Sequence, residues 1–172
     1  MDIRVDDLSR PEIAALLAAH VAFCRGVTPP KSAHVLDLDA LRLPEITFWS
    51  AWDGGSLLGC AALKELDPSH GEIKSMHTAA PYRGRGVGLG LLRHIEGEAR
   101  SRGYRQLSLE TGSFEAFVPA RALYSRYGFV VCAPFGDYRL DPNSVFMTFE
   151  LTGSDLFSPA VEDQMKRWRK GV

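Results

Sequence analysis

The feature that most constrains this chain is a short glycine-rich stretch that follows a predicted strand and precedes a predicted helix. Its residues run from Tyr82 to Leu89, read YRGRGVGL and include Gly84, Gly86 and Gly88. A loop without side chains lets backbone amides approach an anion closely, and the first turn of the following helix presents unpaired N–H groups and a positive dipole end at the same place. Arg83 and Arg85 add forked donors suited to phosphate. The stretch therefore predicts a pyrophosphate cradle.

The spacing of the glycines separates this cradle from two other phosphate loops. The P-loop of nucleotide triphosphatases ends in Gly-Lys-Ser or Gly-Lys-Thr, whereas this chain has Val87-Gly88-Leu89. The dinucleotide fingerprint needs Gly-x-Gly-x-x-Gly in an early βαβ unit, whereas here Gly-x-Gly-x-Gly follows a half of the chain that is rich in hairpins. A nucleotide-binding P-loop protein is therefore only a remote alternative.

Hydrophobic periodicity and turn signals divide the chain into two halves. The first is predicted to hold strands over 2–5, 46–52, 57–66 and 72–78, a helix that Ser9 caps and Gly26 ends, and a short helix over 35–42. The second is predicted to hold a helix ended by Gly103, a strand over 106–109, a helix from Pro119 to Tyr127, and strands over 129–132 and 145–151.

The order of these elements predicts an α+β fold, a mixed α/β domain around one sheet. The early strands pair as antiparallel hairpins, and the helix after the glycines can join 72–78 to 106–109 in parallel through a right-handed crossover. The core pattern stops after residue 151. We therefore expect a domain over 1–151 and a C-terminal tail over 152–172, in which a short docked helix is one candidate.

Charge and composition count against several classes of protein. Lys plus Arg total 20 and Asp plus Glu total 21, so the usual electrostatic reason for a nucleic-acid partner is missing. No run of about 18 apolar residues predicts a membrane span, and charges occupy the place of a signal peptide's apolar run. Cys24, Cys60 and Cys132 are far apart and odd in number, which is typical of reduced thiols. We expect a cytoplasmic protein with no metal site.

Two sequence blocks together resemble a known family. Arg83 to Gly88 fits Arg/Gln-x-x-Gly-x-Gly/Ala, and Ala120 to Phe129 (ARALYSRYGF) fits Ala-x-x-x-Tyr-x-x-x-Gly-Phe. In this order and at this separation they resemble the GNAT superfamily of N-acetyltransferases, over roughly residues 1–150. The stretches 71–76 and 141–144 are similar to a bacterial subgroup of small-molecule acetyltransferases. The resemblance implies a mostly antiparallel sheet, flanked by helices and splayed between its fourth and fifth strands, with acetyl-CoA as co-substrate in the gap.

The resemblance also implies which residues hold the cofactor. The pantetheine arm would pair with the backbone over 76–78, and the pyrophosphate would lie on the amides over 84–89. The expected cofactor-binding residues are Met76, His77, Thr78, Arg83, Gly84, Arg85, Gly86, Val87, Gly88, Leu89 and Tyr124.

Acetyl transfer needs a polarised carbonyl, a neutral amine and a protonated leaving thiolate. Tyr124 corresponds to the family's usual general acid, and a phenol with a pKa near 10 suits an alkyl thiolate. The backbone N–H of Met76 would hydrogen-bond the carbonyl oxygen as it gains charge. The base stays open between Glu72, Glu110, His77 and a water chain to bulk. Some protein-acetylating members carry a catalytic Glu at the position of Glu72, although here it follows a turn and could be exposed.

The acceptor wall is expected from residues 9–42 and from the loop over 135–144. Its polar candidates are Lys31, His34, Arg42, Asp137, Tyr138 and Asn143. Basic groups there would suit a substrate with a carboxylate, such as an amino acid. Phe117 stands where the family often has an Asn that contacts the cofactor arm, so that contact is not predicted.

The predicted function is transfer of an acetyl group from acetyl-CoA to a primary amine of a small molecule, by direct attack in a ternary complex. Amino acids and amino-acid-like compounds are candidate acceptors. A non-catalytic acyl-CoA-binding or regulatory module and a protein or peptide acetyltransferase are the alternatives. A homodimer is expected from the resemblance alone.

Overall fold

The computed structural model describes residues 1–151, and within them the strands form one seven-stranded sheet. The strands are β1 (Asp2–Val5), β2 (Ile46–Asp53), β3 (Ser56–Asp67), β4 (His70–Thr78), β5 (Gln106–Gly112), β6 (Val130–Val131) and β7 (Ser144–Glu150). Their order is β1-β2-β3-β4-β5-β7-β6, and every neighbouring pair is antiparallel except β4 and β5. The mixed sheet confirms the predicted α+β class. The predicted tail, 152–172, lies outside the described residues.

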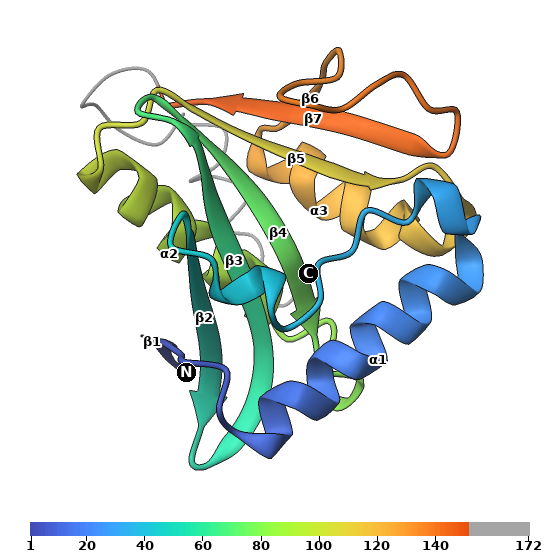
Figure 1. Cartoon of the computed structure of the whole chain (residues 1–172). Helices are drawn as coiled ribbons and strands as arrows, with labels where there is room; N and C mark the ends of the chain where they lie inside the picture. Colours follow the sequence, from blue (N-terminus) through green and yellow to red (C-terminus); the bar gives the residue numbers. More distant parts are fainter. Residues whose placement is uncertain (152–172) are drawn as a thin grey trace, which may run out of the picture.

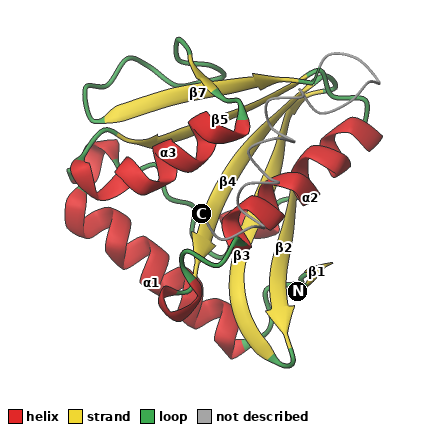
Figure 2. Cartoon of the chain, turned by 180° about the vertical axis from the view of Figure 1, so that it is seen from behind, coloured by secondary structure: helices red, strands yellow, loops and turns green. Residues whose placement is uncertain are grey.

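Helices cover both faces of this sheet. The α-helices of the described part are α1 (Pro11–Val27), α2 (Val87–Ser101) and α3 (Val118–Tyr127), with 3-10 turns η1 (Pro30–Ser32), η2 (Ala40–Arg42), η3 (Ala80–Tyr82) and η4 (Glu115–Phe117). Side chains alternate between the two faces of a strand, and β3 shows the consequence. Ala61 and Leu63 lie in the core with α2, and Cys60 and Ala62 lie in the core with α1. Figure 2 shows α2 and α3 together on the face away from α1.

The described residues contain no helix long and apolar enough to cross a membrane.

Strands β4 and β5 are paired along only part of their length. Their parallel register runs from His70 opposite Gln106 to Ile73 opposite Leu109 and ends there, although β4 continues to Thr78. Beyond this point the two strands diverge, as Figure 1 shows, and α1 crosses the open end of the gap. The predicted splay between the fourth and fifth strands is confirmed.

A bulge in β4 lies at the start of the diverging part. The register against β3 shifts between Cys60 and Ala62, so two residues of β4 oppose one residue of β3. Ser75, inside the bulge, has a φ of 49°, a left-handed value that few residues other than glycine adopt. Bulges bend a strand and re-aim its side chains, and this one lies directly after the last residue of β4 that pairs with β5.

Two local predictions in the first half are wrong. Ser9 does not cap α1, because the carboxylates of Asp6 and Asp7 accept the N–H groups of Leu8 and Ser9 in a turn before the helix. The N-cap residue is Arg10, and no side chain caps this end.

The predicted helix over 35–42 is reduced to the single turn η2. The carboxylate of Asp37 accepts the N–H of Ala40 at 2.8 Å, so the turn starts only there. The predicted strand over 129–132 is likewise reduced to β6, which pairs with β7 at the edge of the sheet.

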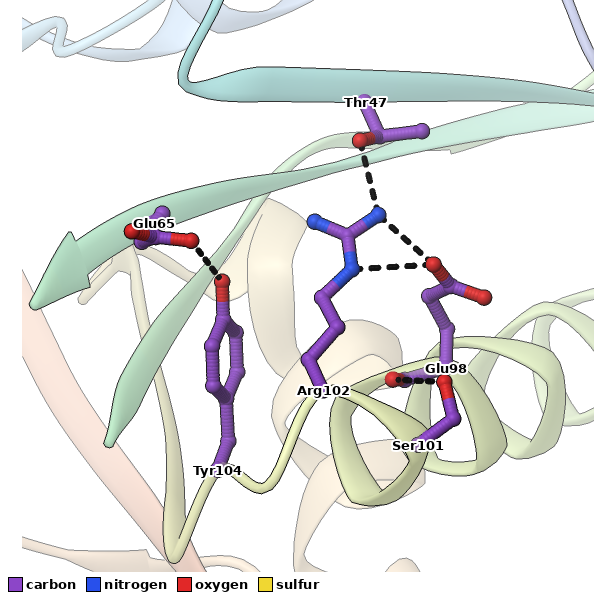
Figure 3. A network of polar contacts seen from close by, with 6 residues as sticks. All are labelled: Thr47, Glu65, Glu98, Ser101, Arg102 and Tyr104. Carbon is purple, nitrogen blue, oxygen red and sulfur yellow. Dashed lines mark hydrogen bonds and ion pairs between the residues drawn. The ribbon is translucent and has the colours of Figure 1, made fainter. Parts of the chain in front are cut away.

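The C-terminal end of α2 is tied to the sheet by polar contacts (Figure 3). Arg102 Nη2 donates to Glu98 Oε1 at 2.7 Å and to Thr47 Oγ1 of β2 at 2.8 Å. The Tyr104 hydroxyl donates to Glu65 Oε2 of β3 at 2.8 Å. These contacts join the end of the helix to β2 and β3.

Candidate active site

A cleft of about 1260 Å³ opens where β4 and β5 part. It is lined by residues of α1, the unpaired part of β4, the glycine loop, α2, the end of β5, and α3. Its cationic residues on or beside α2 and α3 are Arg83, Arg93, Arg100 and Arg126. Its other charged lining residues at the apex of the splay are Lys74 and Glu110. Glu96 of α2 and Glu150 of β7 also line it. Away from the apex the cleft thus has four arginines with two carboxylates, and at the apex it has one cation and one carboxylate.

The three glycines of the loop are required for two different reasons. Gly84 and Gly86 have φ values of +73° and +81°, and a Cβ at either would meet nothing within 4 Å, so backbone conformation selects glycine there. Gly88 lies inside α2, and a Cβ there would be 2.9 Å from Leu123 Cδ2 on α3. A side chain at position 88 would therefore require the end of the Leu123 side chain to shift, so close packing of the two helices favours glycine there.

The loop and the first turn of α2 offer unpaired amides to the cleft. Gly86 is the N-cap residue of α2, and the N–H groups of a helix's first turn have no acceptor within the helix. Gly86, Val87, Gly88 and Leu89 all line the cleft. This is the geometry of an anion site at a helix N-terminus.

The two arginines of the loop point into different clefts. Arg83 lines the main cleft, where its Nε donates to the Thr78 carbonyl at 3.3 Å. Arg85 lies over the Tyr82 ring, 5.7 Å from its centroid, and lines a smaller neighbouring cleft with Asp53. The sequence placed both at the phosphate cradle, whereas in the structure only Arg83 borders the main cleft.

The edge of β4 that β5 leaves unpaired contributes Met76, His77 and Thr78 to the cleft. His77 Nδ1 lies 3.2 Å from Nδ1 of His20 on α1. Burial lowers the pKa of both imidazoles to about 4, so at neutral pH both rings are uncharged. Sequence reasoning missed His20, because its helical spacing indicated only a buried face.

Tyr124 is placed by α3 with its ring against Phe129, and only 8% of it is exposed. It borders the cleft, and its hydroxyl has no hydrogen-bond partner among residues 1–151. Burial, together with the nearby Cys24 and Glu110, raises the pKa of the phenol. Tyr124 is therefore a neutral O–H donor at the apex of the splay.

The two candidate carboxylates occupy different environments. Glu110, at the end of β5, lines the cleft, and burial raises its pKa above the ordinary 4.5. Glu72 is 3% exposed, is not among the residues that line the cleft, and is bound by two side chains. Tyr138 donates to Glu72 Oε1 at 2.6 Å, and Lys74 Nζ lies 3.1 Å from the same oxygen. Glu72 is therefore buried, whereas its place after a turn had suggested an exposed residue.

Lys74 and Tyr138 form a buried polar group that the sequence did not predict as a unit. Lys74 Nζ donates to the Tyr138 hydroxyl at 2.6 Å and lies 3.5 Å from the His34 carbonyl. The two-residue spacing of Glu72 and Lys74 could have indicated a shared strand face. No local signal could have brought Tyr138, which lies on the loop between β6 and β7, to the same place.

The polar residues expected in the acceptor wall are divided by the structure. His34 lines the cleft, whereas Lys31, Arg42 and Asp137 do not. Arg42 instead contacts Asp39 and the Leu8 carbonyl.

Phe117 lines the cleft, whereas Asn143 does not. Asn143 donates to Ser32 Oγ at 3.1 Å, which joins the β6–β7 loop to η1. Phe117 lines the cleft and meets Phe23 of α1 edge-on, with ring centroids 5.3 Å apart.

Comparison with known proteins assigns the family. Residues 14–129 match the family model described as "Acetyltransferase (GNAT) family". The chain is 54% identical over 151 residues to YsnE of Bacillus subtilis, an uncharacterized N-acetyltransferase, covering 88% of this chain and 100% of that protein. It is 42% identical over 120 residues to an IAA acetyltransferase of Azospirillum brasilense, covering 69% and 77%. The chain belongs to the GNAT family.

A solved structure shares the fold. A GNAT family acetyltransferase from Elizabethkingia anophelis, crystallised with acetyl-CoA bound, superposes with a TM-score of 0.65 at 20% identity, covering 87% of this chain and 97% of that one. Family membership and the named relatives make the chain an N-acetyltransferase that uses acetyl-CoA.

Proposed function

We propose that this enzyme transfers the acetyl group of acetyl-CoA directly to the primary amine of a small molecule, with both substrates bound in the cleft between β4 and β5. The observation that carries the proposal is a single continuous cleft. It joins the unpaired amides at the start of α2 to the free hydroxyl of Tyr124 and the carboxylate of Glu110. A phosphate-binding end and an acid–base end are thus in one space, within the domain over 1–151.

Acetyl-CoA occupies the cleft from the glycine loop to the apex. Its pyrophosphate accepts hydrogen bonds from the amides over 84–89, and Arg83 supplies charge beside them. Its pantetheine arm pairs with the open edge of β4 over 76–78, which brings the thioester to the Met76 N–H. Arg85 contributes to the field of this end from the neighbouring cleft rather than by contact from the main one.

The reaction forms one bond and breaks one. The neutral amine attacks the thioester carbon, a C–N bond forms, and the oxygen gains negative charge that the Met76 N–H stabilises. The C–S bond then breaks, and Tyr124 gives its proton to the leaving thiolate. Burial raises the pKa of this phenol above the ordinary value near 10. The phenol is therefore protonated at neutral pH but is a weaker acid than the sequence suggested, and it donates its proton as negative charge develops on the sulfur.

Glu110 is the base that the cleft favours. It borders the same space as Tyr124, whereas the Glu72 carboxylate is held by Tyr138 and Lys74. Glu110 accepts a proton from the amine only when it is ionised. Activity is therefore expected to fall as the pH drops through its pKa, which burial places above 4.5. In Glu110→Gln this acid limb of kcat/KM should disappear.

The test is thiol release from acetyl-CoA in the presence of a panel of small amines and, in a separate assay, of IAA, because the Azospirillum brasilense relative is named an IAA acetyltransferase. Tyr124→Phe should lower kcat by about 100-fold, the size of a general-acid contribution. The matched control is Tyr104→Phe, which removes a hydroxyl bound to Glu65 away from the cleft and should leave kcat unchanged. Unchanged turnover in Tyr124→Phe would contradict the assignment of Tyr124 as the general acid.

The panel also separates the alternatives. Tight binding of acetyl-CoA with no thiol release by any acceptor would favour a non-catalytic or regulatory acyl-CoA-binding module. Release with lysine-containing peptides but with no small amine would favour a protein acetyltransferase. A homodimer and a cytoplasmic location remain expectations, to be measured by light scattering and by fractionation.

A further inference from the structure

We propose that the acceptor is a primary amine on an apolar, aromatic body with no carboxylate beside the amine. This inference rests on the proposed function and names the substrate class of the same site. It departs from the amino-acid acceptor that the basic residues of the sequence suggested. Two independent features of the acceptor end of the cleft carry it: the balance of charge and the character of the wall.

At the acceptor end, carboxylates outnumber cationic side chains by one. Lys74 is the cation of this end, and its charge is already paired with Glu72 at 3.1 Å. His20 and His77 are neutral because burial lowers the pKa of each to about 4. Among the lysine, arginine, aspartate and glutamate residues of this end, Glu110 is then the remaining charge, and it lines the cleft together with His34. A ligand with a single positive charge balances this end.

The ammonium of Lys74 has little capacity left for a substrate carboxylate. Its partners are Glu72 Oε1, the Tyr138 hydroxyl and the His34 carbonyl. Its side chain is only 9% exposed. A carboxylate would therefore have to displace one of these partners and would also lie near Glu110. Like charges brought together in a site shielded from water are strongly unfavourable.

Part of the wall is apolar and aromatic, beside polar residues that include Thr28, Ser32 and Thr111. Phe23 of α1 and Phe117 at the start of α3 meet edge-on, and Val35 borders the same cleft. The Phe117 ring lies directly on the backbone of Gly112, where an added Cβ would come within 2.3 Å of it. The ring is thus fixed where the family often carries a polar Asn. Such a wall fits the flat face of an aromatic body better than a second charge.

Matched acceptors test the proposal in the acetyl-CoA assay. Tryptamine and tryptophan differ by one carboxylate, and tryptophanamide has the size of tryptophan without its charge. We expect kcat/KM for tryptamine to exceed that for tryptophan by at least about 10-fold, the ratio that corresponds to 1.4 kcal/mol. Tryptophanamide should lie within a few-fold of tryptamine. Equal use of tryptophan would overturn the proposal, and so would equally poor use of tryptophan and tryptophanamide, because size would then explain the discrimination.

Binding provides a readout that does not need turnover. Tyr124→Phe saturated with acetyl-CoA is titrated with tryptamine and tryptophan by calorimetry, and tryptamine should bind at least about 10-fold more tightly. In Glu110→Gln this ratio should shrink toward one, because the repelling charge is gone. Phe117→Asn should weaken tryptamine but not ethylamine, which has no aromatic body. A ratio that survives in Glu110→Gln would overturn the assignment of the discrimination to this carboxylate.

Acetyl transfer to a small amine and the class of the acceptor are contradicted by different results. If no small amine releases thiol, the proposed function fails, and the calorimetric ratio still decides the acceptor class. If amines are acetylated but amino acids are preferred, the proposed function stands and the acceptor class is wrong.

Discussion

The two ends of helix α2 differ in the groups that contact them. At the C-terminal end the protein supplies the partners: Arg102 bridges Glu98 and Thr47, and the chain then returns to the sheet through Tyr104 (Figure 3). At the N-terminal end no side chain caps the helix, and the N-cap residue is Gly86 in a left-handed conformation. One end is completed by protein groups, and the other presents its first-turn amides to a cleft.

The comparison shows how one helix can serve packing and binding at once. Exposed first-turn amides are a site for an anion only if the helix cannot shift to satisfy them in another way. The polar contacts at the C-terminal end, and the contact that Gly88 permits with Leu123, hold α2 in place. We therefore expect substitutions at the N-terminal end to change cofactor binding and substitutions at the C-terminal end to change stability.

Within helix α2, the largest effect is expected from Gly86→Ala. Its φ of +81° is unfavourable by about 1–2 kcal/mol for a residue with a Cβ. The loop should respond by moving its amides away from the pyrophosphate, and KM for acetyl-CoA should rise at least about 10-fold, which corresponds to 1.4 kcal/mol. Steady-state kinetics with varied acetyl-CoA measure this change.

The matched control is Gly97→Ala in the middle of the same helix. A Cβ there meets nothing within 4 Å, so the change should stabilise the helix by about 0.5–1 kcal/mol and leave KM unaltered. Similar KM values for the two variants would contradict the assignment of this helix end to the cofactor.

A smaller effect, of the opposite kind, is expected from Arg102→Met. The substitution removes the ion pair with Glu98 and the bond to Thr47 while keeping an unbranched chain over Trp49. Because the pair is partly exposed, the free energy of unfolding should fall by only about 1 kcal/mol. Urea denaturation measures it, and KM for acetyl-CoA should stay within twofold. A large rise in KM with unchanged stability would contradict the assignment of cofactor binding to the N-terminal end and of stability to the C-terminal end.

The smallest effect is expected from Thr47→Val, which keeps the shape of the side chain and removes one acceptor from Arg102. Since Arg102 keeps both bonds to Glu98, the free energy of unfolding should fall by about 0.5 kcal/mol. Combined with Arg102→Met, this variant should add almost nothing, because both remove the same bond. Full additivity in the double variant would show that Thr47 acts through other contacts.

Local patterns identified the parts of this enzyme whose conformation depends on neighbouring residues. The loop of glycines, the helix after it and the tyrosine of α3 were all predicted, because positive φ values, helix starts and helical spacing are set within a few residues. The wrong predictions of helix starts and helix lengths also have a cause within a few residues. Asp6, Asp7 and Asp37 take backbone N–H groups in turns, and such short-range competition changed where a helix began or whether it formed.

The roles of distant side chains could not be assigned in this way. The sequence left Glu72 and Glu110 among the rival bases, because Glu72 lies on one predicted strand and Glu110 directly follows another, both near the gap. Only the tertiary structure places Tyr138, 66 residues away, on the carboxylate of Glu72, and leaves Glu110 facing the cleft. Likewise it turns Arg85 away from Arg83 and brings His20 to His77.

The sequence by itself predicted an anion site at the start of one helix and placed a tyrosine in the pattern of an acetyltransferase. The tertiary structure decided which charges meet, because the register of β4 against β5, the bulge at Ser75 and the path of the β6–β7 loop depend on contacts between residues far apart in the chain. Local backbone geometry is encoded locally, whereas burial and the pairing of charges exist only once the chain has packed.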